Sequence, residues 1–456
     1  MQLSPEAYFY SLDWMFISFI RAWRCSVRMH VAVIGSGYVG LTTGACLADQ
    51  LHNVICVDND VRKIETLSKG KMPIHEPGLE NLVLSNVREG RLTFTADISA
   101  VRGKDVVFLC VGTPPRKDGS ADVSALLNCA KDVVSNINQY TVIVEKSTVP
   151  AGTAEAMKLV ARKYAGGKDY DVAVNPEFLR EGSAVNDSFH PDRVVIGSNS
   201  ARAHAVLAEL YRPLNAPILL TDMTTAELIK HGSNAFLAMK ISYANLIASL
   251  AEKVGADGLL ALKGIGMDKR IGEEFLKPGI GYGGFCFPKD LAAFIALFRQ
   301  NGVECGLLEQ VAAVNEEQKM RYVRKVELLC NGLEGKTLGV LGLAFKPDTD
   351  DMRLAPSIGI IAALQNKGAA INAYDPQAME KAKEVLKDVK FCSDPYEALA
   401  GADALLLLTE WKQFEHLDFD KAKSLLKHPI IADGRDLYRP DRMRALGFTY
   451  SGIGRR

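Results

Sequence analysis

Short apolar runs alternate with helical patterns along most of this chain, and this alternation constrains the fold more than any other feature of the sequence. Continuously apolar strands are buried on both faces, which is typical of parallel sheets covered by helices on each side. The alternation therefore predicts an α/β fold with a doubly wound sheet. The first strand-like runs stand at 30–35 (HVAVIG), 53–58 (NVICVD), 105–112 (DVVFLCVG) and 141–147 (TVIVEKS), with helical patterns at 39–50 and 61–68.

The alternation is interrupted once and then starts again. Residues 223–254 contain no proline and carry apolar side chains at helical spacing, which predicts one or two long helices. The apolar positions are Leu228, Phe236, Met239, Tyr243, Leu246 and Leu250. Strand-like runs return at 336–345, 370–375, 404–409 and 429–434. We therefore expect two Rossmann-like, doubly wound domains joined by a central helical domain. The expected units are an N-terminal extension at 1–28, a sheet domain at 29–222, the helical domain at 223–325 and a second sheet domain at 326–456.

The balance of charge and the cysteine pattern exclude several classes of protein. The chain has 54 Lys and Arg against 54 Asp and Glu, so its formal net charge is zero. A general nucleic-acid binder needs an excess of basic residues, so no nucleic-acid partner is expected. The nine cysteines are scattered without a CxxC pair. This argues against a disulfide framework or a structural metal site and favours a reducing, cytoplasmic location.

The first 28 residues differ from the rest of the chain. Their best apolar run, 14–20, is far shorter than the ~20 residues of a membrane span, so no membrane insertion is expected. Basic residues follow this run instead of preceding it, which argues against a signal peptide. Because Met29 stands directly before a strand, we expect translation to start there or residues 1–28 to be a loosely attached extension. A short amphipathic anchor is the alternative.

The first chemical signal is a glycine-rich turn after the first strand. Gly35, Gly37 and Gly40 stand in GxGxxG spacing at the start of a helical pattern. The first glycine permits a tight turn, the second lets a pyrophosphate approach the backbone, and the third lets the helix pack closely on the sheet. Asp58 ends the next strand, where an acidic residue grips the adenine ribose and disfavours a 2′-phosphate. The combination predicts binding of NAD.

The second signal is a cysteine at the start of a helix. Cys286 follows the glycines of GYGGFC, and Pro288 suits a first helical turn. A helix N-terminus and the nearby Lys289 both lower a thiol pKa, which favours a nucleophilic thiolate. A buried structural cysteine is the other interpretation. We apply it to Cys46, Cys56, Cys110, Cys129, Cys305, Cys330 and Cys392.

Polar residues between these two signals complete a candidate site. Thr148 follows a strand, where α/β proteins place their ligands. Glu177 and Glu181 follow the strand-like run DVAVN, and Lys230 and Asn234 stand four residues apart, so they share one face of a helix. Taken singly, each has a purely structural interpretation as a surface carboxylate, a capping threonine or a lysine that reaches solvent.

Many ordered motifs between about 29 and 440 resemble those of the nucleotide-sugar 6-dehydrogenase family. They are GSGYVGL, PIHEPGLE, VGTP, KSTVPAGT, NPEFLREGSA, AELIKHGSNAFLAMKISYANLIA, GMDKRIG, FLKPGIGYGGFCFPKD, LGLAFKPDTDDMR and DGRDLY. Within the family, the DKRIG and FLKPGIGYGG stretches look like the UDP-glucose branch. The resemblance implies an NAD-binding domain, a helical dimerisation domain and a UDP-sugar-binding domain.

The resemblance implies an oxidation of UDP-glucose to UDP-glucuronate with two NAD⁺ and one water. In that scheme Lys230, Asn234, Asp290 and a water near Thr148 manage the proton of the alcohol. Cys286 captures the aldehyde as a thiohemiacetal, whose oxidation leaves a thioester. Glu181 positions or activates the hydrolytic water, with Glu177 beside it.

The resemblance also implies the ligand contacts. Arg270 is the residue expected to reach the neighbouring active site of a homodimer. The expected cofactor contacts are Gly35, Gly37, Tyr38, Val39, Gly40, Asp58, Lys63, Thr113, Thr148, Glu181, Lys289 and Arg353. The expected substrate contacts are Glu177, Phe178, Leu179, Arg180, Glu181, Lys230, Asn234, Arg270, Phe275, Leu276, Lys277, Pro278, Gly279, Gly283, Lys346 and Arg435.

Two other functions stay open at this stage. One is a different oxidoreductase: a dehydrogenase of GDP-mannose or a UDP-N-acetylhexosamine, or a two-electron β-hydroxyacid dehydrogenase. A β-hydroxyacid dehydrogenase has no need of Cys286 or of a second sheet domain. The other is a non-catalytic protein that senses NAD, which the presence of Cys286 disfavours.

Overall fold

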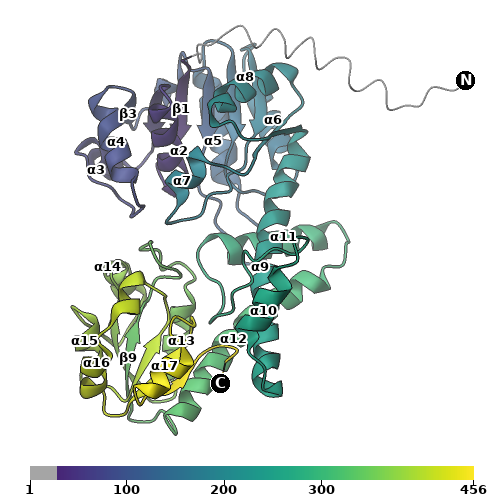
Figure 1. Cartoon of the computed structure of the whole chain (residues 1–456). Coiled ribbons are helices and arrows are strands. Elements are labelled where there is room, and N and C mark those ends of the chain that lie inside the picture. The colour runs from purple at the N-terminus through teal and green to yellow at the C-terminus, as the bar shows by residue number, and fades with distance from the viewer. Residues whose placement is uncertain (1–27, 456) are drawn as a thin grey trace, which may run out of the picture.

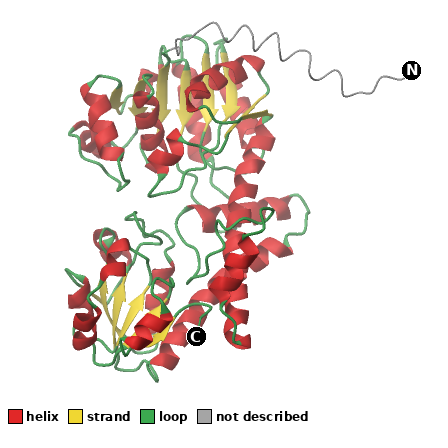
Figure 2. Ribbon diagram, in the orientation of Figure 1, coloured by secondary structure: helices red, strands yellow, loops and turns green. Residues whose placement is uncertain are grey.

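The computed structural model describes residues 28–455 of the chain (Figure 1). The expectations for the N-terminal extension concern residues that lie, apart from Arg28, outside this range. Two helix-covered sheets lie at opposite ends of the molecule, and a long helix, α9 (Met223–Val254), runs between them (Figures 1 and 2). This arrangement is the expected pair of sheet domains with a helical domain in the middle.

The first sheet has the strand order β3-β2-β1-β4-β5-β6-β7-β8. At its centre Val31 lies opposite Val54 on one side and Val106 on the other, and all three are buried. Full burial of an aliphatic side chain contributes roughly 1.5–3 kcal/mol, so this centre stabilises the domain. The strands are β1 (His30–Ile34), β2 (Asn53–Val57), β3 (Leu92–Thr95), β4 (Val106–Leu109), β5 (Thr141–Glu145), β6 (Tyr170–Val174), β7 (Val194–Ser198) and β8 (Ile218–Thr221).

One strand pair departs from the predicted parallel sheet. Strands β6 and β7 are antiparallel, with Ala173 opposite Ser198, whereas β7 and β8 are parallel to each other. The sheet is therefore mixed beyond β6. The helices of this domain are α2 (Tyr38–Asp49), α3 (Val61–Ser68), α4 (Leu79–Arg88), α5 (Ser124–Asn136), α6 (Thr153–Tyr164), α7 (Ala184–Phe189) and α8 (Ala201–Tyr211), with short 3₁₀ turns at Ile98–Val101 and Arg212–Leu214.

The predicted long helix is a single element with clear ends. Asp222 caps its first turn by accepting a hydrogen bond from the Thr225 amide, and Gly255 ends it in the left-handed conformation. Helices α10 (Gly258–Gly266), α11 (Cys286–Gln300) and α12 (Gly306–Leu329) pack against it. Helix α12 continues beyond residue 325, so the boundary expected there falls inside a helix.

The face that α9 buries carries mainly small side chains, and its large apolar residues lie on the other face. Alanines line the buried side, namely Ala226, Ala235, Ala238, Ala244, Ala248 and Ala251. Large side chains stay open to solvent, with exposed fractions of 47% for Leu228, 56% for Phe236, 45% for Tyr243, 43% for Leu246 and 59% for Leu250. We call these five residues the α9 stripe. Small residues on the buried side let α11 and α12 approach closely, and this leaves the stripe without a partner in the chain's own core.

The second sheet is parallel throughout, with the order β11-β10-β9-β12-β13-β14. Its strands are β9 (Thr337–Leu341), β10 (Ala370–Tyr374), β11 (Val389–Phe391), β12 (Ala404–Leu407), β13 (Ile430–Asp433) and β14 (Thr449–Ser451). Its helices are α13 (Pro356–Gln365), α14 (Met379–Val385), α15 (Pro395–Leu399), α16 (Phe419–Leu425) and α17 (Pro440–Ala445), with a 3₁₀ turn at Lys412–His416. Across residues 28–455, no helix combines the length and the apolar character that crossing a membrane requires.

Candidate active site

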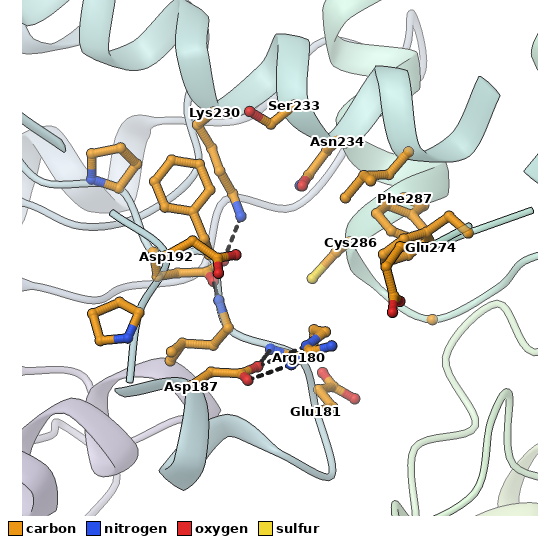
Figure 3. A pocket seen from close by; sticks show the side chains of 18 of the residues that line it. Arg180, Glu181, Asp187, Asp192, Lys230, Ser233, Asn234, Glu274, Cys286 and Phe287 are labelled. Carbon is orange, nitrogen blue, oxygen red and sulfur yellow. Dashed lines mark hydrogen bonds and ion pairs between the residues drawn. The ribbon is translucent and has the colours of Figure 1, made fainter. Parts of the chain in front are cut away.

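A cavity of about 1150 Å³ lies where the three parts of the chain meet. Its walls come from the loop after β6, from one face of α9, from the loop that precedes α11 and from the loops after β9 and β13. The labelled side chains of Figure 3 surround this space, with Lys230 and Asn234 on one side, Cys286 on another, and Arg180 and Glu181 below. The cavity therefore gathers residues that are far apart in the sequence.

The glycine turn beside this region has the geometry that its spacing predicts. Gly35 has a φ of +96°, and a Cβ there would lie 2.6 Å from the Cys110 carbonyl oxygen. A Cβ on Gly40 would lie 1.8 Å from the Gly35 oxygen, so the helix needs glycine to pack here. A Cβ on Gly37, by contrast, would meet nothing within 4 Å. The open space at Gly37, directly before α2, fits the pyrophosphate of a dinucleotide.

Asp58 is held at the end of β2 by the turn that it faces. Its carboxylate accepts hydrogen bonds from the Ser36 amide at 2.7 Å and the Asp60 amide at 3.0 Å, and Lys63 Nζ lies 2.8 Å away. Burial raises the pKa of Asp58, but Lys63 and the two amides outweigh it and leave that pKa below its usual value. The group is therefore an ionised acceptor, suited to a ribose diol and repulsive to a phosphate.

A buried ion pair stands at the centre of the cavity. Lys230 Nζ, on α9, lies 2.9 Å from Glu177 Oε1, and both side chains are almost completely buried. The other Glu177 oxygen accepts a hydrogen bond from the Leu179 amide at 2.6 Å. Burial lowers the pKa of Lys230, but Glu177, Cys286 and Asp290 raise it above its ordinary value. These neighbours therefore favour the ammonium form of Lys230, which lines the cavity.

A second polar pair lies one helical turn further along α9. Asn234 Nδ2 donates to Asp290 Oδ2 at 2.6 Å, and Lys289 Nζ lies 2.6 Å from Asp290 Oδ1. All three side chains are buried. Asp290 thus orients Asn234, whose side chain faces the cavity, while Lys289 is occupied by Asp290 and does not line the cavity.

The surroundings of Cys286 contradict the prediction of a lowered thiol pKa. The residue does open α11, as expected. Burial nevertheless raises the pKa of the thiol to about 12, and Glu177, Asp290 and Glu181 add to the rise while Lys230 opposes it. The prediction was wrong because burial of the thiol outweighs the helix N-terminus, and because Lys289, which was expected to lower the pKa, pairs with Asp290. The thiol is neutral in this structure.

Glu181 lies at the junction with the C-terminal sheet domain. Its Oε1 is 3.3 Å from Arg353 Nη2, and its Oε2 is buried without a hydrogen-bond partner. Burial raises the pKa of Glu181 to about 8; Asp351 adds to the rise, and Arg353 and Lys346 oppose it. A carboxyl group with a pKa in this range can exchange a proton near neutral pH, as a general base requires.

The loop that carries Glu177 and Glu181 is anchored by residues that the sequence analysis did not single out. Asn175 accepts hydrogen bonds from Lys146 Nζ at 2.9 Å and Tyr211 Oη at 2.5 Å, and it donates to the Val195 oxygen at 2.8 Å. At the other end of the loop, Glu76 accepts from the amides of residues 182 and 184. Glu76 belongs to the motif PIHEPGLE and Lys146 to KSTVPAGT, so only the quoted motifs could have pointed to them.

The loop 275–284, which precedes Cys286, is fixed by three amide side chains of the helical domain. Asn245 accepts a hydrogen bond from the Gly279 amide at 2.8 Å, and Gln318 donates to the Gly279 oxygen at 2.8 Å. Asn315 both accepts from the Tyr282 amide at 2.8 Å and donates to its oxygen at 3.0 Å. The loop is thus held in place before any ligand binds.

The second sheet domain contributes two cations to the cavity wall. Lys346 follows β9, and burial lowers its pKa while Glu181 opposes that effect. Arg435 follows β13 and donates from Nε to the Leu408 oxygen at 2.8 Å and from Nη2 to the Phe345 oxygen at 3.1 Å. Both line the cavity and can face an anionic ligand there.

Most of the expected substrate contacts line the cavity, namely Glu177, Phe178, Leu179, Arg180, Glu181, Lys230, Asn234, Phe275, Lys277, Pro278, Gly279, Gly283, Lys346 and Arg435. Two expected contacts do not. The Leu276 side chain is buried among apolar residues of the helical domain, and the Arg270 side chain is 89% exposed beside Asp268. Of the expected cofactor residues, Thr113 donates to the Thr148 oxygen at 2.9 Å, and Tyr38 hydrogen-bonds Glu76.

Comparison with known proteins gives one family for three segments that together make up most of the chain. Residues 29–215 match the NAD binding domain of the UDP-glucose/GDP-mannose dehydrogenase family, 224–317 match its central domain, and 339–440 match its UDP binding domain. A UDP-glucose 6-dehydrogenase of Rhizobium meliloti (strain 1021) is 48% identical over 435 residues, which cover 94% of this chain and 100% of the relative. The UDP-glucose 6-dehydrogenase TuaD of Bacillus subtilis (strain 168) is 46% identical, with 93% of each chain covered.

Solved structures share the same architecture. A UDP-glucose dehydrogenase from Pyrobaculum islandicum aligns with a TM-score of 0.89 at 38% identity and covers 95% of this chain and 99% of its own. A UDP-D-ManNAc dehydrogenase from Pyrococcus horikoshii aligns with a TM-score of 0.83 at 28% identity and covers 94% of this chain and 99% of its own.

Proposed function

This chain belongs to the UDP-glucose/GDP-mannose dehydrogenase family, and we propose that within it the chain is an NAD-dependent UDP-glucose 6-dehydrogenase. The overall reaction converts the C6 alcohol of the sugar to a carboxylate. It consumes two NAD⁺ and one water and gives two NADH and three protons. The observation that carries the proposal is one cavity that joins Cys286 to two polar pairs, Lys230–Glu177 and Asn234–Asp290.

In the first oxidation the alcohol must lose a proton and a hydride. NAD bound at the glycine turn supplies the hydride acceptor. Lys230 and Asn234 face the cavity and can donate hydrogen bonds to the developing alkoxide. Asp290 holds Asn234, and a water near Thr148 receives the proton. Such positioned proton transfer contributes typically ~10²–10⁴-fold to the rate.

In the second oxidation the aldehyde stays attached to the protein. The Cys286 sulfur forms a bond to the aldehyde carbon and gives up its proton, and the aldehyde oxygen becomes the hydroxyl of a thiohemiacetal. Because the thiol is neutral before substrate arrives, its deprotonation accompanies this attack, with Lys230 stabilising the negative charge. Loss of a hydride and a proton then leaves a thioester. Covalent capture lets one site run two oxidations without releasing the aldehyde.

Hydrolysis of the thioester completes the reaction. Glu181 accepts a proton from water as the water oxygen attacks the thioester carbon, and the Cys286 sulfur leaves and regains its proton. A pKa of about 8 for Glu181 makes it a stronger base than an ordinary carboxylate once it is ionised. Glu177 stays paired with Lys230 beside it.

The UDP part of the substrate is assigned to the second sheet domain and to the loop 275–284. Lys346 and Arg435 offer positive charge to the diphosphate, and the backbone of the fixed loop packs along the ligand. A Cβ on Gly283 would lie 2.4 Å from the Leu354 oxygen, so the loop must have glycine to meet this domain.

The exposed α9 stripe supports a homodimer through the helical domain. A large apolar face on a helix is typical of an obligate interface. Leu250→Glu is expected to shift the chain toward monomers in analytical ultracentrifugation, whereas Leu159→Glu, which changes a leucine on α6 that is also largely exposed, is not. In the dimer, the exposed Arg270 reaches the neighbouring site. A stable monomer as the wild-type species would contradict this. The free thiols of the described cysteines suit the cytoplasm, the location that we assign.

The proposal is tested by counting NADH formed per UDP-glucose consumed, with purified protein and excess NAD⁺. Two NADH per sugar is the expected result. One NADH would mean that the reaction stops at the aldehyde, which would overturn the thioester mechanism. If UDP-glucose is not consumed, the same assay with GDP-mannose and UDP-N-acetylhexosamines identifies the related activity.

A further inference from the structure

Three charged groups from two domains meet at the edge of the cavity. Glu181 belongs to the loop after β6, whereas Asp351 and Arg353 belong to the loop between β9 and α13. Arg353 Nη2 lies 2.6 Å from Asp351 Oδ2 and 3.3 Å from Glu181 Oε1. One guanidinium nitrogen therefore serves two carboxylates, and the nearer of them is the one on its own loop.

Asp351 holds this arginine with more contacts than Glu181 does. Its carboxylate also accepts from Arg353 Nε at 2.9 Å and from the Arg353 amide at 2.9 Å. The Asp351 side chain is 9% exposed and that of Glu181 is 12% exposed, so water screens neither charge well. Glu181 Oε2 has no hydrogen-bond partner. Glu181 thus faces a second buried negative charge whose cation is largely committed elsewhere.

The other charged groups around Glu181 have fixed roles of their own. Lys346 approaches from the same C-terminal loop and is assigned to the diphosphate. Tyr38 and Glu76 bond to each other and to the amide of residue 182. Cys286 is neutral before substrate arrives. Asp351 is therefore the one neighbour in this group that adds an unassigned negative charge.

We propose that Asp351 is a positioning residue for hydrolysis, which reaches across the domain junction, holds Arg353 and makes Glu181 a better proton acceptor. The inference rests on the proposed function, because it concerns the last step of that reaction. Its physical basis is that a like charge nearby disfavours ionisation, which raises the pKa of the carboxyl group that must take up a proton from water. Hydrolysis then depends on the second sheet domain being in place.

The test separates the two kinds of step in one reaction. In rapid-quench experiments with UDP-glucose and excess NAD⁺, NADH reports the oxidations and free UDP-glucuronate reports hydrolysis. For Asp351→Asn we expect the pH midpoint of hydrolysis to move down by about one unit, because removing a like charge lowers the pKa of Glu181. NADH formation should keep its wild-type pH dependence.

Asp350→Asn is the matched control. Asp350 stands next in the chain but pairs with Lys381 at 2.7 Å, away from Glu181, so its variant should keep the wild-type midpoint. An unchanged midpoint in Asp351→Asn, or equal shifts in both variants, would overturn the proposal.

A second variant covers the case in which Asp351→Asn does not fold. Asp351→Glu keeps the charge, so its hydrolysis midpoint should stay at or above the wild-type value, and a lower midpoint would overturn the proposal. The proposed function fails separately: in that case wild-type protein would form no UDP-glucuronate at all.

Discussion

The two sheet domains begin with the same turn and use it differently. Gly35 follows β1 with a φ of +96°, and Gly342 follows β9 with a φ of +89°. A Cβ on Gly35 would lie 2.6 Å from Cys110, just after the neighbouring strand β4, and one on Gly342 would lie 2.5 Å from Thr409, just after β12. Each turn thus needs glycine for the same two reasons, a left-handed backbone and a close neighbour.

In each domain, the acid at the end of the next strand accepts hydrogen bonds from the glycine turn. Asp58 accepts from the amide of Ser36, and Asp375 accepts from the amides of Leu343 and Ala344 at 2.7 and 3.0 Å. The two domains therefore share a strand, a glycine turn and a carboxylate that binds the turn.

The difference is where the helix starts. Helix α2 begins at Tyr38, within the glycine motif, whereas α13 does not begin until Pro356. The intervening loop of the second domain carries Lys346 and Asp351 toward the cavity. In this chain, the turn that is followed directly by a helix N-terminus is the one that matches a dinucleotide site. Where a loop follows, the same scaffold delivers side chains to a neighbouring site (Figure 1).

The largest loss of stability is expected from removing Asp375, the carboxylate that binds the glycine turn of the second sheet domain. Asp375 also accepts hydrogen bonds from the amides of residues 377 and 378 and from Trp411, and it is buried. Asp375→Ala leaves these donors unpaired and should lower the free energy of unfolding by about 3 kcal/mol in urea titrations. Asp58→Ala should cost about 1 kcal/mol and should mainly weaken NAD binding. Equal losses of unfolding free energy in both variants would contradict the expected difference between the two acids.

Gly37 and its counterpart Ala344 give a sharper contrast. A Cβ on Gly37 meets no protein atom within 4 Å, so Gly37→Ala should leave the thermal midpoint unchanged. It should raise KM for NAD by at least about tenfold, or about 1.4 kcal/mol, because the methyl group occupies the space for the pyrophosphate. Ala344→Gly should leave that KM unchanged. A normal KM in Gly37→Ala would place the dinucleotide elsewhere.

The smallest measurable change in stability is expected from substituting the acids at the ends of β5 and β13. Glu145 ends β5 and Asp433 ends β13. Burial and the nearby Glu227 raise the pKa of Glu145 well above its usual value, so it holds a proton in the folded state. Glu145→Gln should therefore change stability by less than about 1 kcal/mol near neutral pH. Asp433 accepts hydrogen bonds from two amides and from Tyr450. Asp433→Asn should therefore lower the free energy of unfolding by more than Glu145→Gln does.

The raised pKa of Glu145 also predicts how the free energy of unfolding depends on pH. An acid whose pKa is raised by folding binds its proton more tightly in the folded chain than in the unfolded chain. The contribution of Glu145 to wild-type stability should therefore fall as pH rises above about 5, the range in which an unfolded glutamate ionises. Glu145→Gln removes part of this slope, which chemical denaturation at several pH values measures. A steeper slope in the variant would contradict the assignment.

Features that depend on neighbours in sequence could be predicted. The glycine turn was found because three glycines, a strand and a helix stand within one short segment. Helix α3 runs over Val61–Ser68 and α9 over Met223–Val254, as predicted, because Asp60 and Asp222 cap them locally. The family resemblance supplied the grouping of Cys286 with Lys230 and Asn234.

Features that depend on tertiary packing could not be predicted. Lys230 and Glu177 are 53 positions apart, and nothing in either segment indicates that they form an ion pair. The buried face of α9 is lined by alanines, and which face is buried depends on how α11 and α12 pack against it. The thiol pKa of Cys286 was also mispredicted, because tertiary burial raises it and because Glu177 and Glu181 approach from the loop after β6.

The central claim is that the sugar is held covalently on Cys286 between the second oxidation and hydrolysis. Glu181→Gln, mixed with UDP-glucose and NAD⁺ and quenched in acid, should accumulate a UDP-glucuronyl thioester, which mass spectrometry of the intact protein and of the Cys286 peptide detects. Cys286→Ser should show no adduct and should form no UDP-glucuronate. An adduct on another residue, or acid formation by Cys286→Ser, would contradict the account.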